Sequence, residues 1–239
     1  MYTKKELYKY KQVIKFLEND LSDDFSFSVV MEIIKSMFEK IESIEILFKH
    51  KQYDAGRVII RPCLQMSANL MFMIEDKKDI KRRARAYNSW CVQNIEYKAS
   101  SFISSSGPAL QESLNYEYNS VLNQTFPDVE PSAFKTLLKI QRDSFFETNK
   151  KRAWYNILEV YDTEEQFINK YIPENGSFLY KIFSEYVHGN DVAFRLGSKD
   201  SSLESSLDSL AFHTIFFYLR KILNTMILFS PERQKYENI

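Results

Sequence analysis

The sequence predicts an all-α protein, an irregular bundle of long amphipathic helices. Apolar residues recur at helical three- and four-residue intervals, and the alternation typical of β-strands is absent from the sequence. Glycine (5 residues) and proline (6 residues) are scarce among 239 residues, so the turns of a many-stranded sheet lack their usual residues. The length and the 44% hydrophobic content predict a single domain over residues 1–239, with residues 1–25 as a peripheral N-terminal helix.

The first two helices are expected at residues 3–20 and 27–49. Thr3 and Glu6 have the spacing of a capping box, and apolar residues follow at helical intervals. The stretch "LSDDFSFS" separates this helix from the second, whose apolar positions make a broad face.

A third helix is expected from Asp54, as its N-cap, to about Ile74. Pro62 either kinks this helix or marks where its regular part begins. A helix with a basic first half follows in "KKDIKRRARAYNSWCVQNIEYKASSF", and "SSSGP" at 104–108 is a loop.

Shorter helices are expected in the second half of the chain, at residues 109–123, 132–146, 154–160 and 163–171. The last of these opens with a Thr163 and Gln166 capping box. The next helix ends at Gly189, and the serine-rich "GSKDSSLESSLDS" then leads to a terminal apolar helix at 211–229. That helix contains Arg220 and Lys221, so it is predicted to be a buried core helix and not a membrane span, with His213 as a hydrogen-bonded core residue.

Composition narrows the classes of function. Lys plus Arg and Asp plus Glu both total 32, so no overall charge attracts the chain to nucleic acid or to an anionic membrane. Cys63 and Cys91 suit neither a zinc site nor a disulfide framework and are expected to be reduced core residues. The N-terminus lacks the apolar run of a secretory signal, which favours a cytoplasmic location. No metal-binding, phosphate-loop or cofactor motif is present in the sequence.

The stretch "FLYKIFSEYVHGND" at 178–191 carries the most plausible chemistry. Tyr180, Ser184 and His188 recur at four-residue intervals along one helical strip, and Asn190 follows the helix end. His188 is the group in this strip that exchanges a proton near neutral pH, and Tyr180 and Ser184 could donate hydrogen bonds to a substrate oxygen. The alternative is structural, because a histidine in the last turn before Gly189 stabilises a helix end without any ligand.

A second polar strip lies in "GRVIIRPCLQMSANLMFMI". Arg57, Arg61, Gln65 and Asn69 also recur at four-residue intervals, among apolar residues. Such groups are costly to bury unless they are paired, so the strip is either half of a polar pocket or an ordinary solvent-exposed face. We expect Arg61 to act with His188, and the other three residues and Asn190 to bind ligand.

A basic run forms a third candidate site, which would bind RNA or DNA through phosphate contacts. Its cations are Lys77, Lys78, Lys81, Arg82, Arg83 and Arg85. They spread around a helix, and the competing interpretation is a solvated surface.

The two polar strips resemble a bacterial helical family catalogued as domain of unknown function 5677. "RPCLQMSANLMFM" is similar to the family's R-P-x-x-E-x-x-x-N helix, and "WYNILEVYD…FLYKIFSEYVHGN" to its W…Y-x-x-x-S-x-x-x-H segment. The resemblance covers roughly residues 30–229. Gln65 departs from it, because the resemblance implies an acid there, and a neutral amide is no general base and a poor metal ligand.

Two hypotheses follow. In the first, the chain is a prokaryotic defence or toxin-like protein that cleaves RNA without a metal, using His188 and a cation from Arg61 or Arg57. The arginine that usually precedes the histidine in such helical nucleases is missing here. In the second, the chain is a non-catalytic sensor or adaptor that binds a small anionic ligand or a protein partner. Long apolar helices also favour a homodimer.

Overall fold

A computed structural model of the chain describes residues 4–21, 24–88, 90–91, 107–109, 111–113, 153–157, 161–188 and 201–236. All secondary structure in these residues is helical, which confirms the predicted fold class. The chain folds as two compact units, residues 1–84 with 161–239, and residues 85–160. The prediction of one domain stays a prediction. In the described part of the chain no helix combines the length and low charge that crossing a membrane requires.

The larger unit begins with two helices, α1 (Lys4–Leu21) and α2 (Phe25–Lys49), close to their expected bounds. α1 packs on α2 and on α10, and its Leu17 is fully buried. α2 begins where the Asp24 carboxylate accepts a hydrogen bond from the backbone N–H of Ser26 at 2.8 Å. Thr3, the expected cap of α1, lies outside the described residues.

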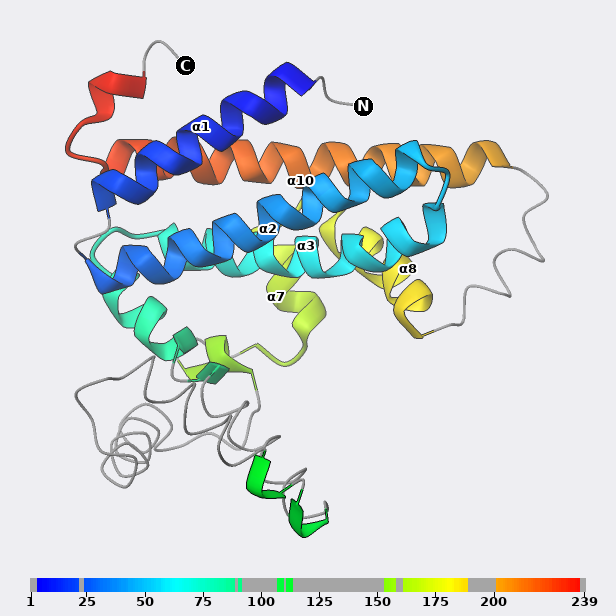
Figure 1. Cartoon of the computed structure of the whole chain (residues 1–239), viewed down its shortest axis with the longest axis horizontal. Coiled ribbons are helices and arrows are strands. Elements are labelled where there is room, and N and C mark those ends of the chain that lie inside the picture. Colours follow the sequence, from blue (N-terminus) through cyan, green and yellow to red (C-terminus); the bar gives the residue numbers. More distant parts are fainter. Residues whose placement is uncertain are drawn as a thin grey trace. The chain divides into compact units, whose positions relative to one another are not determined.

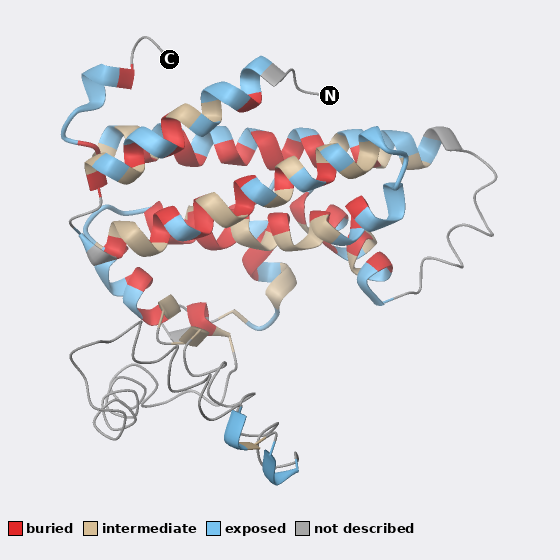
Figure 2. Ribbon diagram, viewed as in Figure 1, coloured by how far each residue is buried: buried red, intermediate tan, exposed pale blue. Residues whose placement is uncertain are grey.

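Helix α3 (Tyr53–Ile74) lies at the centre of this unit and packs against α2, α7, α8 and α10 (Figure 1). It starts one residue before Asp54, so Asp54 belongs to the first turn and is not the N-cap as expected. Pro62 lies inside the helix. Figure 2 shows buried residues along α3, interspersed with half-buried ones.

The second half of this unit contributes α7 (Glu164–Tyr171), α8 (Gly176–His188), α10 (Ser201–Phe229) and the 3-10 turn η2 (Arg233–Tyr236). The predicted capping box opens α7, because Thr163 Oγ1 accepts from the backbone N–H of Gln166 at 3.1 Å. Gln166 in turn accepts from the N–H of Asp162, one residue before the cap.

α10 is longer than expected, because the serine-rich segment from Ser201 onward is helical. Leucines at helical spacing within that segment, Leu203, Leu207 and Leu210, continue the apolar pattern of the terminal helix. His213 was expected to be buried but is exposed, since it lies on the outer face of α10 with Phe217.

The smaller unit is described only in part. Tyr87 packs edge-on against Trp154 with 5.2 Å between ring centroids. Trp154–Ile157 forms the 3-10 turn η1, where a helix was expected to Val160. Residues 108–109 and 111–113 are helical, while most of the expected helix at 109–123 and all of that at 132–146 lie outside the described residues.

Candidate functional site

The predicted strips of α3 and α8 meet at Arg61 and Tyr180. Arg61 Nη2 donates to the Tyr180 hydroxyl at 2.5 Å, and the guanidinium carbon lies 4.7 Å from the centroid of the Tyr180 ring. Arg57 stacks on Tyr186 further along, so the two helices run antiparallel. Arg57 and Asn69 of the α3 strip are buried, and Arg61 and Gln65 are half-buried, so the strip lies largely between helices.

An acid from α7 completes this contact. Glu164 accepts from the Tyr180 hydroxyl and from the Gln65 amide, both at 2.5 Å. Its nearer oxygen lies 4.0 Å from Arg61 Nη2, the outer limit of an ion pair. We call Arg61, Gln65, Glu164 and Tyr180 the Arg61 cluster. It carries one positive and one negative charge, linked mainly through the tyrosine hydroxyl.

Burial and the hydrogen bond to Glu164 raise the pKa of Tyr180 to about 12. Arg61 opposes this shift. Tyr180 therefore keeps its proton at neutral pH and serves as a hydrogen-bond donor to Glu164.

Arg61 has spare hydrogen-bonding capacity. Its side chain is 25% exposed, and its Nε is buried without a hydrogen-bond partner among the described atoms. Leaving a buried N–H unpaired costs about 1–3 kcal/mol, so a water or ligand atom at this point would be stabilising.

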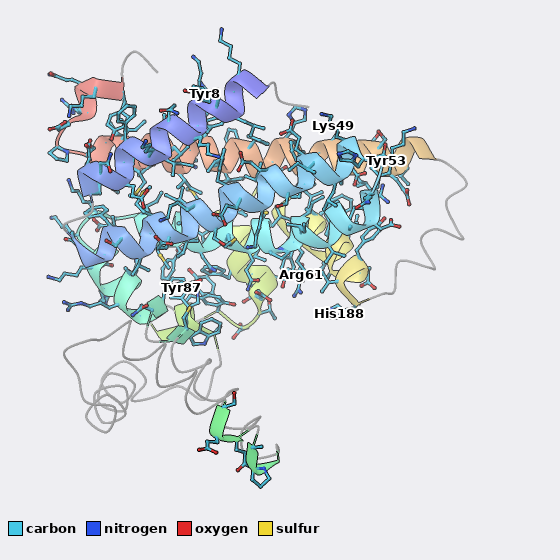
Figure 3. All side chains as sticks on the ribbon, viewed as in Figure 1. Tyr8, Lys49, Tyr53, Arg61, Tyr87 and His188 are labelled. Atoms are coloured by element: carbon cyan, nitrogen blue, oxygen red, sulfur yellow. The ribbon has the colours of Figure 1, made fainter. Side chains whose placement is uncertain are left out.

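The rest of the α8 strip does not join the cluster through direct contacts. The Ser184 hydroxyl donates to the backbone carbonyl of Tyr180 at 2.6 Å, within its own helix. His188 is exposed at the end of α8, about 12 Å along the helix axis from Tyr180. Figure 3 labels Arg61 on α3 and His188 at the end of α8. No described residue hydrogen-bonds to the His188 side chain, and Asn190 lies outside the described residues.

Arg57 forms a different and fully engaged cluster. Its Nε and Nη2 bind both oxygens of Asp208 at 2.9 and 2.8 Å, and Nη1 lies 3.1 Å from Glu204 and 3.4 Å from Asp54. Burial lowers the pKa of Arg57, but the hydrogen bonds and charge of Asp208 outweigh this and raise it, so the guanidinium stays charged. Arg57 thus joins α3 to α10, and each of its three guanidinium nitrogens already binds a carboxylate. Asn69, the last residue of the strip, is buried.

The basic run is not a uniform cationic surface. Arg83 is buried, donates to the Phe72 carbonyl and lies 3.0 Å from Glu75. Arg82 and Arg83 both pair with Asp79, at 3.0 and 3.5 Å. Lys77, Lys78, Lys81 and Arg85 are exposed like Arg82, and for these five a nucleic-acid patch stays a prediction.

Sequence reasoning missed the acids that organise both clusters. Glu164 was seen only as part of a helix start, and Glu204 and Asp208 only as members of a serine-rich connection. Asp208 falls between Leu207 and Leu210, so a helical reading of that segment would have placed an acid near the apolar face. Within the described ranges no three His, Cys, Asp or Glu side chains are arranged to hold a metal ion.

Comparison with known proteins assigns a family. The sequence model of a family of unknown function, DUF5677, matches residues 27–203. The chain belongs to this family. The DUF5677 match contains every residue of the Arg61 cluster, but it ends one residue before Glu204, so two acids around Arg57 lie beyond it. The search of curated proteins and the search of solved structures gave no match.

Proposed function

We propose that this DUF5677 protein is a helical binding module that takes a small anionic, phosphate-bearing ligand at Arg61. The observation that carries the proposal is the contrast between two neighbouring arginines. All three guanidinium nitrogens of Arg57 are occupied by carboxylates. Arg61 uses only Nη2, and its nearest carboxylate is already bound by Gln65 and Tyr180.

A planar guanidinium with free N–H groups suits phosphate, which accepts paired hydrogen bonds from it. Tyr180 stacks under the guanidinium and restricts its motion, so less side-chain entropy is lost when a ligand binds. Such a site needs no base, and the neutral Gln65 is therefore compatible with it.

A thermal shift with nucleoside monophosphates and inorganic phosphate tests this function. We expect the phosphates to raise the Tm of the natural protein and to leave that of Arg61→Ala unchanged. Arg220→Ala removes an exposed guanidinium from α10 and is the matched control, which should respond like the natural protein. An equal response from Arg61→Ala would contradict the proposal.

RNA cleavage in a defence or toxin system is the second candidate function. One observation favours it: His188 is exposed on the helix that also supplies Tyr180, so an RNA strand could reach both its imidazole and Arg61. The imidazole would transfer the proton and the guanidinium would stabilise the phosphorane. The separation along α8 makes binding the better supported function.

Expression in a bacterial host and cleavage of purified RNA test the second candidate. We expect growth arrest and cleavage from the natural protein and neither from His188→Ala. Cleavage by His188→Ala at the natural rate would exclude the histidine mechanism, while phosphate binding at Arg61 could still hold.

A further inference from the structure

A cavity of about 230 Å³ lies where the end of α2, the start of α3 and the first half of α10 come together. It shares no lining residue with the Arg61 cluster. Two serines of α10, Ser205 and Ser209, form part of its wall. The other lining residues are mainly aromatic and acidic: Glu45, Phe48, Tyr53, Asp208, Phe212 and His213. Figure 3 labels Tyr53 at the start of α3, next to the chain reversal that follows Lys49.

The charge around this cavity is negative. Two carboxylates line it, and one of them, Asp208, is paired with Arg57, whose guanidinium also contacts Glu204 and Asp54. The other, Glu45 of α2, forms no ion pair with the described residues. A cation entering the cavity would therefore gain electrostatic stabilisation in partly desolvated surroundings.

The aromatic walls are fixed by their own packing. The Phe48 ring packs edge-on against Tyr53 at 5.5 Å between centroids, and stacks on Phe212 at 6.5 Å. The ring also lies directly over Gly56, where a Cβ atom would overlap its carbons. Faces of aromatic rings next to a carboxylate attract alkylammonium groups through cation–π and charge interactions.

We infer that this cavity binds a small organic cation, an alkylamine or quaternary ammonium compound, held by Glu45 and the rings of Phe48 and Tyr53. The volume suits a ligand of a few carbon atoms and excludes a large cofactor. This inference does not depend on phosphate binding at Arg61.

Calorimetric titration with choline, tetramethylammonium and putrescine tests the inference. 3,3-Dimethylbutan-1-ol, a neutral isostere of choline, is the ligand control. We expect at least one cation to bind and the alcohol to bind at least about fivefold more weakly, a difference of about 1 kcal/mol.

Single substitutions test whether the cation binds in this cavity. Glu45→Gln should weaken cation binding by about fivefold or more, and Tyr53→Leu by a similar factor. Glu39→Gln removes an exposed carboxylate from the same helix outside the cavity and should bind like the natural protein. Arg61→Ala should also bind like the natural protein, which separates this site from the proposed function.

Three results would overturn the inference. They are equal affinity for choline and its neutral isostere, undiminished binding by both cavity variants with their fold intact by circular dichroism, and no heat from any of the three cations at millimolar concentration.

Discussion

At the scale of single residues, the two arginines one helical turn apart on α3 have different roles because their partners differ. Arg57 is 4% exposed and held by Asp208, Glu204 and Asp54. Arg61 is more exposed and is held by the hydroxyl and the ring of one residue, Tyr180. The first arrangement fixes a helix to its neighbour, and the second leaves Arg61 Nε without a hydrogen-bond partner among the described residues.

Removing the Asp208 carboxylate should destabilise the protein strongly. Asp208→Asn leaves the buried Arg57 charge without its bidentate partner, at a cost of about 3 kcal/mol. Urea denaturation followed by circular dichroism measures this. The double variant Arg57→Met with Asp208→Leu should recover much of the loss, because no unpaired buried charge remains. A single variant as stable as the natural protein would show that the pair is not buried as described.

Removing the Tyr180 hydroxyl should have a smaller effect. Tyr180→Phe takes a donor from Glu164 and an acceptor from Arg61 but keeps the ring, so we expect a loss of about 1–2 kcal/mol in the free energy of unfolding. Tyr8→Phe is the control, since Tyr8 is 63% exposed, and it should leave stability unchanged. Equal stabilities for both variants would argue against the bond between Tyr180 and Glu164.

At the scale of elements, α2 shows how one side chain fixes the start of a helix. The backbone N–H of Ser26 lowers the pKa of Asp24, because the hydrogen bond favours the carboxylate. Since the folded pKa is lower than the unfolded value of 3.8, the carboxylate stabilises the fold above pH 3.8. That contribution is lost as pH falls through the folded pKa.

Asp24→Ala should therefore cost about 1 kcal/mol at neutral pH. The difference from the natural protein should shrink at pH values below 3.8, where the natural carboxyl also becomes neutral. Denaturation curves at several pH values measure this difference. A difference that does not change with pH would mean that the carboxylate charge contributes nothing to the cap.

α3 offers a test of helix packing. Replacing glycine by alanine inside a helix normally stabilises it by about 1 kcal/mol. At Gly56 the new methyl group would overlap the Phe48 ring, so we expect Gly56→Ala to lower Tm. A raised Tm would show that the ring moves aside without cost.

Prediction from sequence succeeded where a local pattern alone determines the structure. The apolar repeats gave the helical class and the approximate bounds of α1, α2 and α8, and the Thr163 capping box gave the start of α7. It failed where the packing of individual side chains decides the outcome. His213 lies within the apolar stretch at 211–229 yet faces outward, and the basic run does not show that Arg83 is buried and paired with Glu75 and Asp79.

At the scale of the whole molecule, α3 connects the features described above. Its N-terminal turns pair with α10 and border the cavity lined by Glu45 and Tyr53, and its middle faces α7 and α8 at the Arg61 cluster. The sequence identified both polar strips, but their partners Glu164 and Asp208 could not be paired with them, because they lie 99 and 151 residues away along the chain. A homodimer or a protein partner stays a prediction.

The central claim, that Arg61 binds a phosphate-bearing ligand, is tested most directly by NMR of the arginine Nε–H signals. The Arg61 signal is identified by its loss in Arg61→Lys. During titration with inorganic phosphate and nucleoside monophosphates, we expect this signal to shift in a saturable way while that of Arg57 stays in place. An unchanged Arg61 signal, or equal shifts of both signals, would contradict the claim.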